Sequence, residues 1–143
     1  MATSTLLCES LGNLVIYVAS DETPSDADWD DYVALINAAA GADHSVRVAV
    51  FADGAAPTAM QRKSIAKLAR TQRQKSAVIS DRLTARAVVT ALRWMGIELR
   101  PFSPKAIDAA FDYLELSSHE RAWLLATERR FRARLAGGGS SRS

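Results

Sequence analysis

Short apolar runs in this chain alternate with longer stretches in which apolar residues recur every three to four positions. The runs occupy residues 14–19, 46–51 and 77–80, and a weaker one follows at 97–100. Strand-like runs separated by helical stretches are typical of βαβ units, whose crossovers place the strands parallel to one another. The pattern therefore predicts an α/β fold in which helices cover a mostly parallel sheet.

A further short strand is predicted at residues 4–10, just before the first long run. Leu11-Gly12-Asn13 separates the two strands, and Gly and Asn tolerate the positive φ of a tight turn. The first two strands should therefore be antiparallel. Together the runs predict a mixed, mostly parallel sheet of about five strands with four helices.

Residues that cap helices mark where the helical stretches begin. The predicted N-caps are Ser25, Thr58, Ser103 and Ser117. Gln61 and Glu120 follow two of them by three positions, which is the pattern of a capping box. The helix that begins after Thr58 is expected to place Gln61, Ile65, Leu68 and Gln72 along one line.

The last helical stretch is predicted to be an addition to the α/β domain. The domain is expected to span residues 1–116, and the amphipathic helix residues 117–136. Trp123, Thr127, Phe131 and Leu135 recur on one face of this helix. That apolar face makes a homodimer a plausible arrangement. The Gly- and Ser-rich residues 137–143 are predicted to be a flexible tail.

Composition narrows the class of protein. The chain has 143 residues, 48% hydrophobic and 24% charged, which suits a single globular domain. No apolar run approaches the ~18 residues of a membrane span, and the first residues lack the features of a signal peptide. The one cysteine, Cys8, is expected to be a buried, inert thiol. These features predict a cytoplasmic protein.

Charge is distributed unevenly along the chain. Residues 1–53 contain nine acids and one base, a balance of −8, and residues 54–143 contain seven acids and seventeen bases, a balance of +10. Ordinary solvated faces are the favoured explanation. The alternative is an acidic and a basic patch that steer a charged partner or a second copy of the chain.

Motifs for catalysis or for metal and phosphate binding are missing. His44 and His119 have no second His or Cys nearby at the spacing of metal ligands. The acidic run at 26–31 lacks the glycine and the glutamate of a calcium loop, where Asp31 and Asn37 stand instead. Neither glycine-rich phosphate-binding pattern follows any strand. We therefore predict a protein that is not an enzyme and has no cofactor or metal.

Residues 3–115 resemble a STAS domain, and more specifically the bacterial SpoIIAA-like (STAS/SEC14-like) group. The resemblance depends on the order of elements, the hairpin at 4–18, the acidic helix start at 25–29, and the strands at 48–53, 77–81 and 97–102. It implies a non-enzymatic module that binds a kinase-like or other regulatory protein. Family members are phosphorylated on a serine at the start of the second helix, where this chain offers only Thr58. The SEC14-like label implies a small apolar ligand.

We therefore expect a regulatory protein-interaction module that docks through the start of its second helix. The docking residues are predicted to be Asp53, Thr58, Gln61, Arg62 and Lys63. Thr58 is expected to act mainly as a helix cap, although a phosphate on its hydroxyl would lie near Arg62 and Lys63.

Two alternatives use the basic residues of the second half of the chain. In the first, a basic surface binds nucleic acid or another acidic surface through Lys67, Arg70, Arg73, Lys75, Arg129 and Arg130. The scarcity of aromatic residues in these stretches makes nucleic acid the less favoured partner. In the second, the helix at 117–135 lies on a membrane surface, but its apolar face is narrow.

Overall fold

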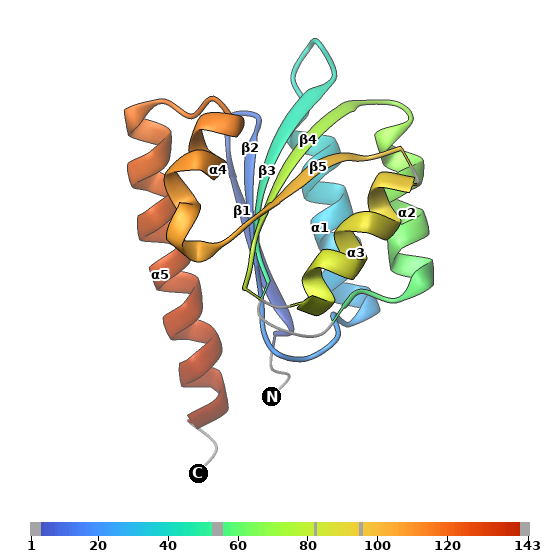
Figure 1. Ribbon diagram of the computed structural model, residues 1–143. Helices are drawn as coiled ribbons and strands as arrows, with labels where there is room; N and C mark the ends of the chain where they lie inside the picture. Colours follow the sequence, from blue (N-terminus) through green and yellow to red (C-terminus); the bar gives the residue numbers. More distant parts are fainter. Residues whose placement is uncertain (1–3, 53–55, 82, 95, 141–143) are drawn as a thin grey trace.

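A computed structural model describes residues 4–52, 56–81, 83–94 and 96–140 of the chain. The elements follow one another as strands and helices in the order that the hydrophobic pattern predicts (Figure 1). They are β1 (Leu6–Leu11), β2 (Leu14–Ala19), α1 (Asp26–Ala39), β3 (Ser45–Phe51), α2 (Ala59–Ala69), β4 (Arg73–Ile79), α3 (Leu83–Trp94), β5 (Glu98–Phe102), the 3₁₀ turn η1 (Pro104–Ala106), α4 (Ile107–Tyr113) and α5 (Ser118–Ser140).

The strands form one mixed sheet in the order β1-β2-β3-β4-β5. β1 and β2 are antiparallel and meet at Leu11 and Leu14, and the other neighbouring pairs are parallel. Gly12 in the turn between β1 and β2 has a φ of 59°, a conformation that glycine adopts without steric cost. The predicted α/β class, the hairpin and the mostly parallel sheet are confirmed.

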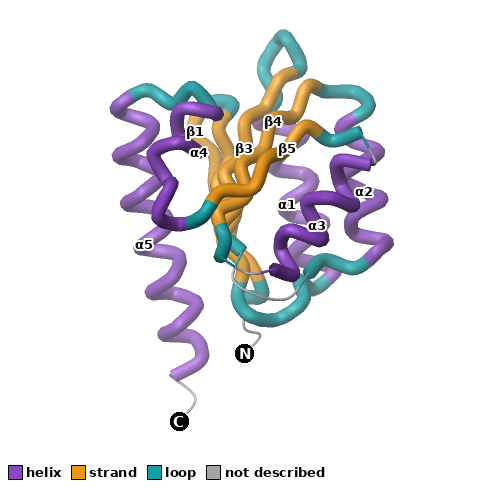
Figure 2. The backbone as a smooth tube through the Cα atoms, in the orientation of Figure 1, coloured by secondary structure: helices purple, strands orange, loops and turns teal. Residues whose placement is uncertain are grey.

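Helices cover both faces of the sheet (Figure 2). α1, α2 and α3 pack on one face, and α4 and α5 pack on the other. Every residue of β2 is buried, because alternate side chains enter the two layers. Leu14, Ile16 and Val18 contribute to the core beneath α4 and α5, and Val15, Tyr17 and Ala19 contribute to the core beneath α1–α3. This double burial explains why the β2 sequence is an unbroken apolar run.

Three of the predicted helix caps are present, whereas Ser103 caps the 3₁₀ turn η1, and α4 begins after Ala106 without a side-chain cap. Ser25 Oγ accepts from Asp28 N at 3.1 Å, and Ser103 Oγ accepts from Lys105 N at 3.2 Å. Ser117 and Glu120 form a reciprocal capping box at the start of α5. The Thr58–Gln61 capping box at the start of α2 is also complete.

α5 packs into the same core as the sheet. Leu124, Thr127 and Phe131 are buried against the layer beneath α4 and α5, while Trp123 and Leu135 are half-buried beside them. The predicted apolar stripe therefore faces the domain. The helix also runs on to Ser140, past residue 137 where a tail was expected, because extending an existing helix costs far less than starting one.

An ion pair between Glu120 of α5 and Arg47 of β3 joins the last helix to the sheet. The Arg47 guanidinium donates to Glu120 Oε1 at 3.0 Å, to Asn13 Oδ1 at 2.8 Å, and to the Leu114 carbonyl oxygen at 3.3 Å. Both charged side chains are about four-fifths shielded from solvent. The hydrogen bonds from Arg47 hold the pKa of Glu120 below its ordinary value.

The end of the second helix and the start of the third parallel strand differ from the sequence prediction. α2 ends at Ala69, so Gln72 is not helical, and β4 begins at Arg73 instead of Ala77. The polar residues 73–76 obscured the strand, because Gln74 and Ser76 occupy inward-facing positions that usually hold aliphatic side chains. With its start at Arg73, β4 places the side chains of Gln74 and Ser76 on the face of the sheet that α1–α3 cover.

Candidate functional site

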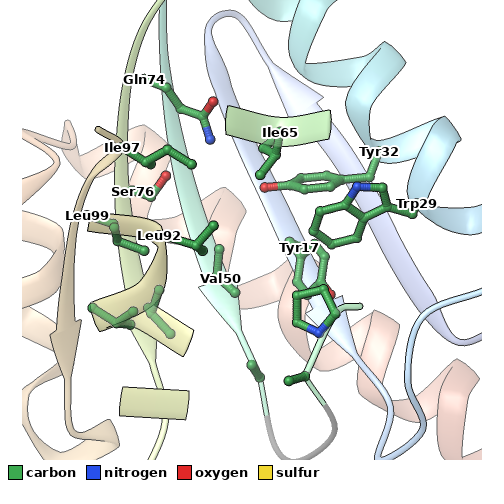
Figure 3. Close-up of a pocket in the computed structure, with 15 residues that line it drawn as sticks. Tyr17, Trp29, Tyr32, Val50, Ile65, Gln74, Ser76, Leu92, Ile97 and Leu99 are labelled. Atoms are coloured by element: carbon green, nitrogen blue, oxygen red, sulfur yellow. The ribbon is translucent and has the colours of Figure 1, made fainter. Parts of the chain in front are cut away.

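An apolar pocket lies between the sheet and helices α1–α3 (Figure 3). Its floor is formed by strand residues that include Tyr17 and Leu99, and its roof includes Ile65 of α2 and Leu92 of α3. The cavity volume is about 80 Å³, several times the ~10–15 Å³ that one water molecule needs. The space is therefore large enough for a small organic molecule.

Three aromatic rings form one wall of the pocket. Tyr17 and Tyr32 have centroids 4.8 Å apart, and Trp29 lies 5.2 Å from Tyr32 and 6.2 Å from Tyr17, all in edge-to-face arrangements. Trp29 Nε1 donates to Ser64 Oγ at 2.8 Å, and Ser64 Oγ donates to the Gln61 carbonyl oxygen at 2.8 Å. The first of these hydrogen bonds ties the Trp29 ring of α1 to α2.

The other polar groups of the pocket come from β4. Gln74 is only 7% exposed and Ser76 only 4%. Gln74 Oε1 has no hydrogen-bond partner in the structure, although an unsatisfied buried acceptor costs about 1–3 kcal/mol. An inward-facing carbonyl without a donor is the least expected feature of an otherwise apolar wall.

The described residues that line this pocket carry no charge. They are Tyr, Trp, Val, Ala, Pro, Ile, Leu, Gln and Ser residues, without an Asp, Glu, Lys, Arg or His among them. Burial raises the pKa of Tyr17 and of Tyr32, so both phenols stay neutral. The site therefore suits a neutral molecule better than an ion.

One end of the pocket lies where β3 finishes. Ala52 follows β3 directly, and Ala56 and Pro57 precede α2 on the same side of the sheet. In open α/β sheets, ligands commonly bind beyond the carboxyl ends of the parallel strands. The predicted docking residue Asp53 falls outside the described residues.

The predicted docking residues at the start of α2 have mixed roles. Thr58 is exposed, and its Oγ1 accepts from Gln61 N at 3.1 Å. Gln61 is buried, and its Nε2 donates to the Pro24 carbonyl oxygen at 2.8 Å and to Asp26 Oδ1 at 3.1 Å. Gln61 therefore ties α2 to α1 and is not on the surface.

The exposed surface at this end of α2 is small and partly apolar. Arg62 is half-buried and donates to the Pro57 carbonyl oxygen at 2.8 Å, whereas Lys63 is exposed. Met60 lies beside them with 73% of its surface exposed. Of the predicted docking residues, Thr58 and Lys63 are exposed to a partner, and the neighbouring Met60 adds an apolar side chain to them.

The residues of the predicted basic surface divide between the two sides of the sheet. Lys67 and Arg70 are exposed in the α2 layer. Arg73 and Lys75 are on the opposite face of β4 from Gln74, because alternate strand residues point to opposite sides. Lys75 Nζ lies 4.6 Å from the ring centroid of Tyr113 in α4.

Two further basic residues belong to α5. Arg129 is exposed, and Arg130 forms an ion pair with Glu9 of β1. Since α5 packs on the α4 side of the sheet, these arginines lie across the sheet from Lys67 and Arg70. The predicted basic surface therefore has Lys67 and Arg70 on one side of the sheet and Arg129 and Arg130 on the other.

Other candidate chemistry has no structural support in the described part of the chain. No three His, Cys, Asp or Glu side chains there come together to hold a metal ion. His44 and His119 are both exposed. Burial, with smaller effects from Asp31 and Asp28, raises the pKa of the Cys8 thiol to about 11, as expected of an inert cysteine. No described helix is both long enough and apolar enough to cross a membrane.

Comparison of the chain with known protein families, curated proteins and solved structures finds no match. Sequence reasoning missed the pocket, although two signals were present. Trp29 and Tyr32 lie three residues apart on one helix face, and Gln74 and Ser76 alternate within what proved to be a strand.

Proposed function

We propose that this protein is a non-enzymatic module that binds a small, neutral, largely apolar molecule between its sheet and helices α1–α3. The observation that carries the proposal is the uncharged pocket with the buried, unpartnered Gln74 Oε1 in its wall. An apolar side chain at position 74 would avoid the cost of burying an acceptor that has no donor. A bound molecule that donates a hydrogen bond would offset it.

The surroundings of the pocket support the same proposal. The aromatic wall offers ring edges and faces, which favour another ring at van der Waals contact. The pocket also ends where ligands of parallel sheets commonly bind. A mostly apolar cavity with few polar groups is the usual form of a small-molecule site.

The proposal is tested with one-ring compounds and the signals of the three tryptophan indoles. Titration with neutral compounds such as phenol and toluene should shift the indole N–H signal of Trp29, which lines the pocket, in a nuclear magnetic resonance spectrum. The signals of Trp94 on the surface and Trp123 on α5 should not move. Absence of any shift at Trp29 across the panel would contradict the proposal.

A pocket-filling variant provides the matched control. Leu92→Trp places a large ring against the pocket, so binding of the panel should be lost. Leu125→Trp makes the same change at an exposed position on α5 and should leave binding intact. Thermal unfolding of both variants establishes that they are folded.

A second candidate function is the regulation of a protein partner, in the manner implied by the resemblance to STAS domains. The order of strands and helices is compatible with that family assignment. The observation that favours docking at α2 is the exposed Met60 beside Lys63, on a helix whose inner face contributes Ile65 to the pocket. Ligand binding and partner binding would then share one helix.

This second function is tested by affinity capture from nuclease-treated cytosol. A stoichiometric regulatory partner should be lost with the Met60→Glu/Lys63→Glu variant and retained with Lys105→Glu, an exposed lysine elsewhere. Loss on Thr58→Asp would indicate control by phosphorylation of Thr58. Capture that occurs only in untreated cytosol, where nucleic acid is intact, and that decreases steeply with salt would favour the alternative of nucleic-acid binding.

A further inference from the structure

The polar atoms of the pocket limit the kinds of molecule that can bind there. This inference rests on the ligand-binding function proposed above. Gln74 Oε1 is an acceptor without a donor, on a side chain that is more than nine-tenths buried. In Figure 3 the Gln74 amide points from β4 toward Ile65 of α2. A molecule in the pocket lies beside the Gln74 side chain, and a donor group on the molecule that reaches the oxygen would satisfy it.

The absence of charge in the described lining argues against an anionic ligand. A carboxylate in this pocket would lose its hydration and find no Lys, Arg or His among those residues. Moving an unpaired ion into an apolar site is far more costly than moving a neutral polar group. Fatty acids and other carboxylates are therefore poor candidates, and so are phosphorylated compounds.

The dimensions and the aromatic wall favour a ring over a chain. The cavity of about 80 Å³ is well below the ~300–1,000 Å³ of pockets that hold drug-sized molecules. Tyr17, Trp29 and Tyr32 already pack edge to face with one another. A flat ring continues that arrangement and buries little polar surface.

We propose that the pocket selects a small, uncharged, single-ring aromatic molecule that carries one hydrogen-bond donor, and that this donor pairs with Gln74 Oε1. The aromatic wall contributes affinity, and the amide oxygen contributes selectivity for a hydroxyl or amine group over a methyl group.

Two matched pairs of probes test the proposal on the full chain. Phenol and toluene have the same number of heavy atoms but differ in the donor, and benzamide and benzoate have similar shapes but differ in charge. Dissociation constants from ligand-detected nuclear magnetic resonance should be about tenfold lower for phenol than for toluene. Benzamide should bind, and benzoate should bind at least tenfold more weakly.

Gln74→Leu tests whether the amide oxygen is the cause. This variant should bind toluene at least as well as the wild type and should lose the preference for phenol. Gln72→Leu makes the same change at a glutamine outside this pocket and should keep the preference. Thermal unfolding confirms that both variants are folded.

The outcomes separate the two proposals. Equal binding of phenol and toluene, or equal binding of benzoate and benzamide, would overturn the donor-bearing neutral ligand while leaving the pocket as a binding site. A phenol preference that survives in Gln74→Leu would also overturn it. If none of the four probes shifts the Trp29 signal, the ligand-binding function itself fails.

Discussion

Gln74 occupies a position in β4 where the fold favours an aliphatic side chain. The next inward position on the same strand holds the small Ser76 and the one after it Val78, and the equivalent surfaces of β2 and β3 include Val15, Val46 and Val48. A polar residue in such a place lowers the stability of the empty protein. Packing does not explain a glutamine here, whereas ligand recognition would.

Because Gln74 Oε1 has no partner, we expect Gln74→Leu to stabilise the ligand-free protein. Removing the unpartnered carbonyl group should raise the free energy of unfolding by about 1 kcal/mol, as measured by urea denaturation. Gln74→Glu should lower it, because it would bury a charge. A loss of stability in Gln74→Leu would show that the amide makes a net favourable contribution to the fold.

Cys8 provides a second test at the residue scale. Its pKa of about 11 leaves few thiolates near neutral pH, roughly a hundredfold fewer than for an ordinary cysteine. Alkylation by iodoacetamide, followed by mass spectrometry, should therefore be slow at pH 7.5 and should accelerate as the pH rises. Unfolding in guanidinium chloride should restore ordinary reactivity. Rapid alkylation of the folded chain would contradict the described burial of the thiol.

At the scale of elements, α1 and α2 are connected by polar contacts as well as by packing. Gln61 closes the capping box with Thr58 and also reaches the Pro24 carbonyl oxygen before α1. The indole of Trp29 reaches Ser64 in the next turn of α2. These contacts hold α1 and α2, two of the three helices that border the pocket, in a fixed relation.

The helix connection predicts unequal effects of two neighbouring substitutions. Thr58→Ala removes one cap and should lower the free energy of unfolding by about 1 kcal/mol. Gln61→Ala also leaves buried partners without hydrogen bonds and should lower it by roughly 2 kcal/mol. Urea denaturation measures both values, with Thr58→Ser as the control that preserves the cap. Equal effects would mean that the contacts with α1 add nothing.

Local signals predicted these elements to different degrees. The caps at Ser25, Thr58 and Ser117 were predictable because capping depends on a few adjacent residues. The start of β4 was not, because Gln74 and Ser76 are polar residues on an inward face and depend on surroundings that the local pattern does not contain. The pocket was missed for the same reason.

At the scale of the whole molecule, the ion pair of Arg47 and Glu120 connects the sheet to α5. The α/β class was predictable from the apolar runs alone, since the central parallel strands β2, β3 and β4 bury side chains on both faces. The position of α5 was not, because an apolar stripe shows that a helix is covered but not what covers it. Long-range contacts such as Arg47 with Glu120 supply that information.

The ion pair predicts a specific dependence of stability on pH. Because the folded state lowers the pKa of Glu120, its contribution is present above about pH 4.3, the ordinary glutamate value, and is lost as the pH falls through the lowered pKa. Glu120→Gln should lower the free energy of unfolding by roughly 2 kcal/mol at pH 7. Its difference from the wild type should shrink toward pH 3.

Urea denaturation at a series of pH values measures this difference. Glu22→Gln, a change at an exposed carboxylate, should follow the wild-type profile. A Glu120→Gln profile parallel to the wild type across the acid range would contradict the proposed role of the ion pair.

The alternation of β2 between two cores has a consequence for how this chain can vary over evolutionary time. A single residue inserted or deleted near the start of β2 would exchange the two sets of side chains, so that Tyr17 would leave the aromatic wall and Ile16 or Val18 would take its place. Point substitutions change one layer at a time, whereas a shift in length changes both at once. The length of this strand should therefore be inherited more strictly than the identity of any residue in it.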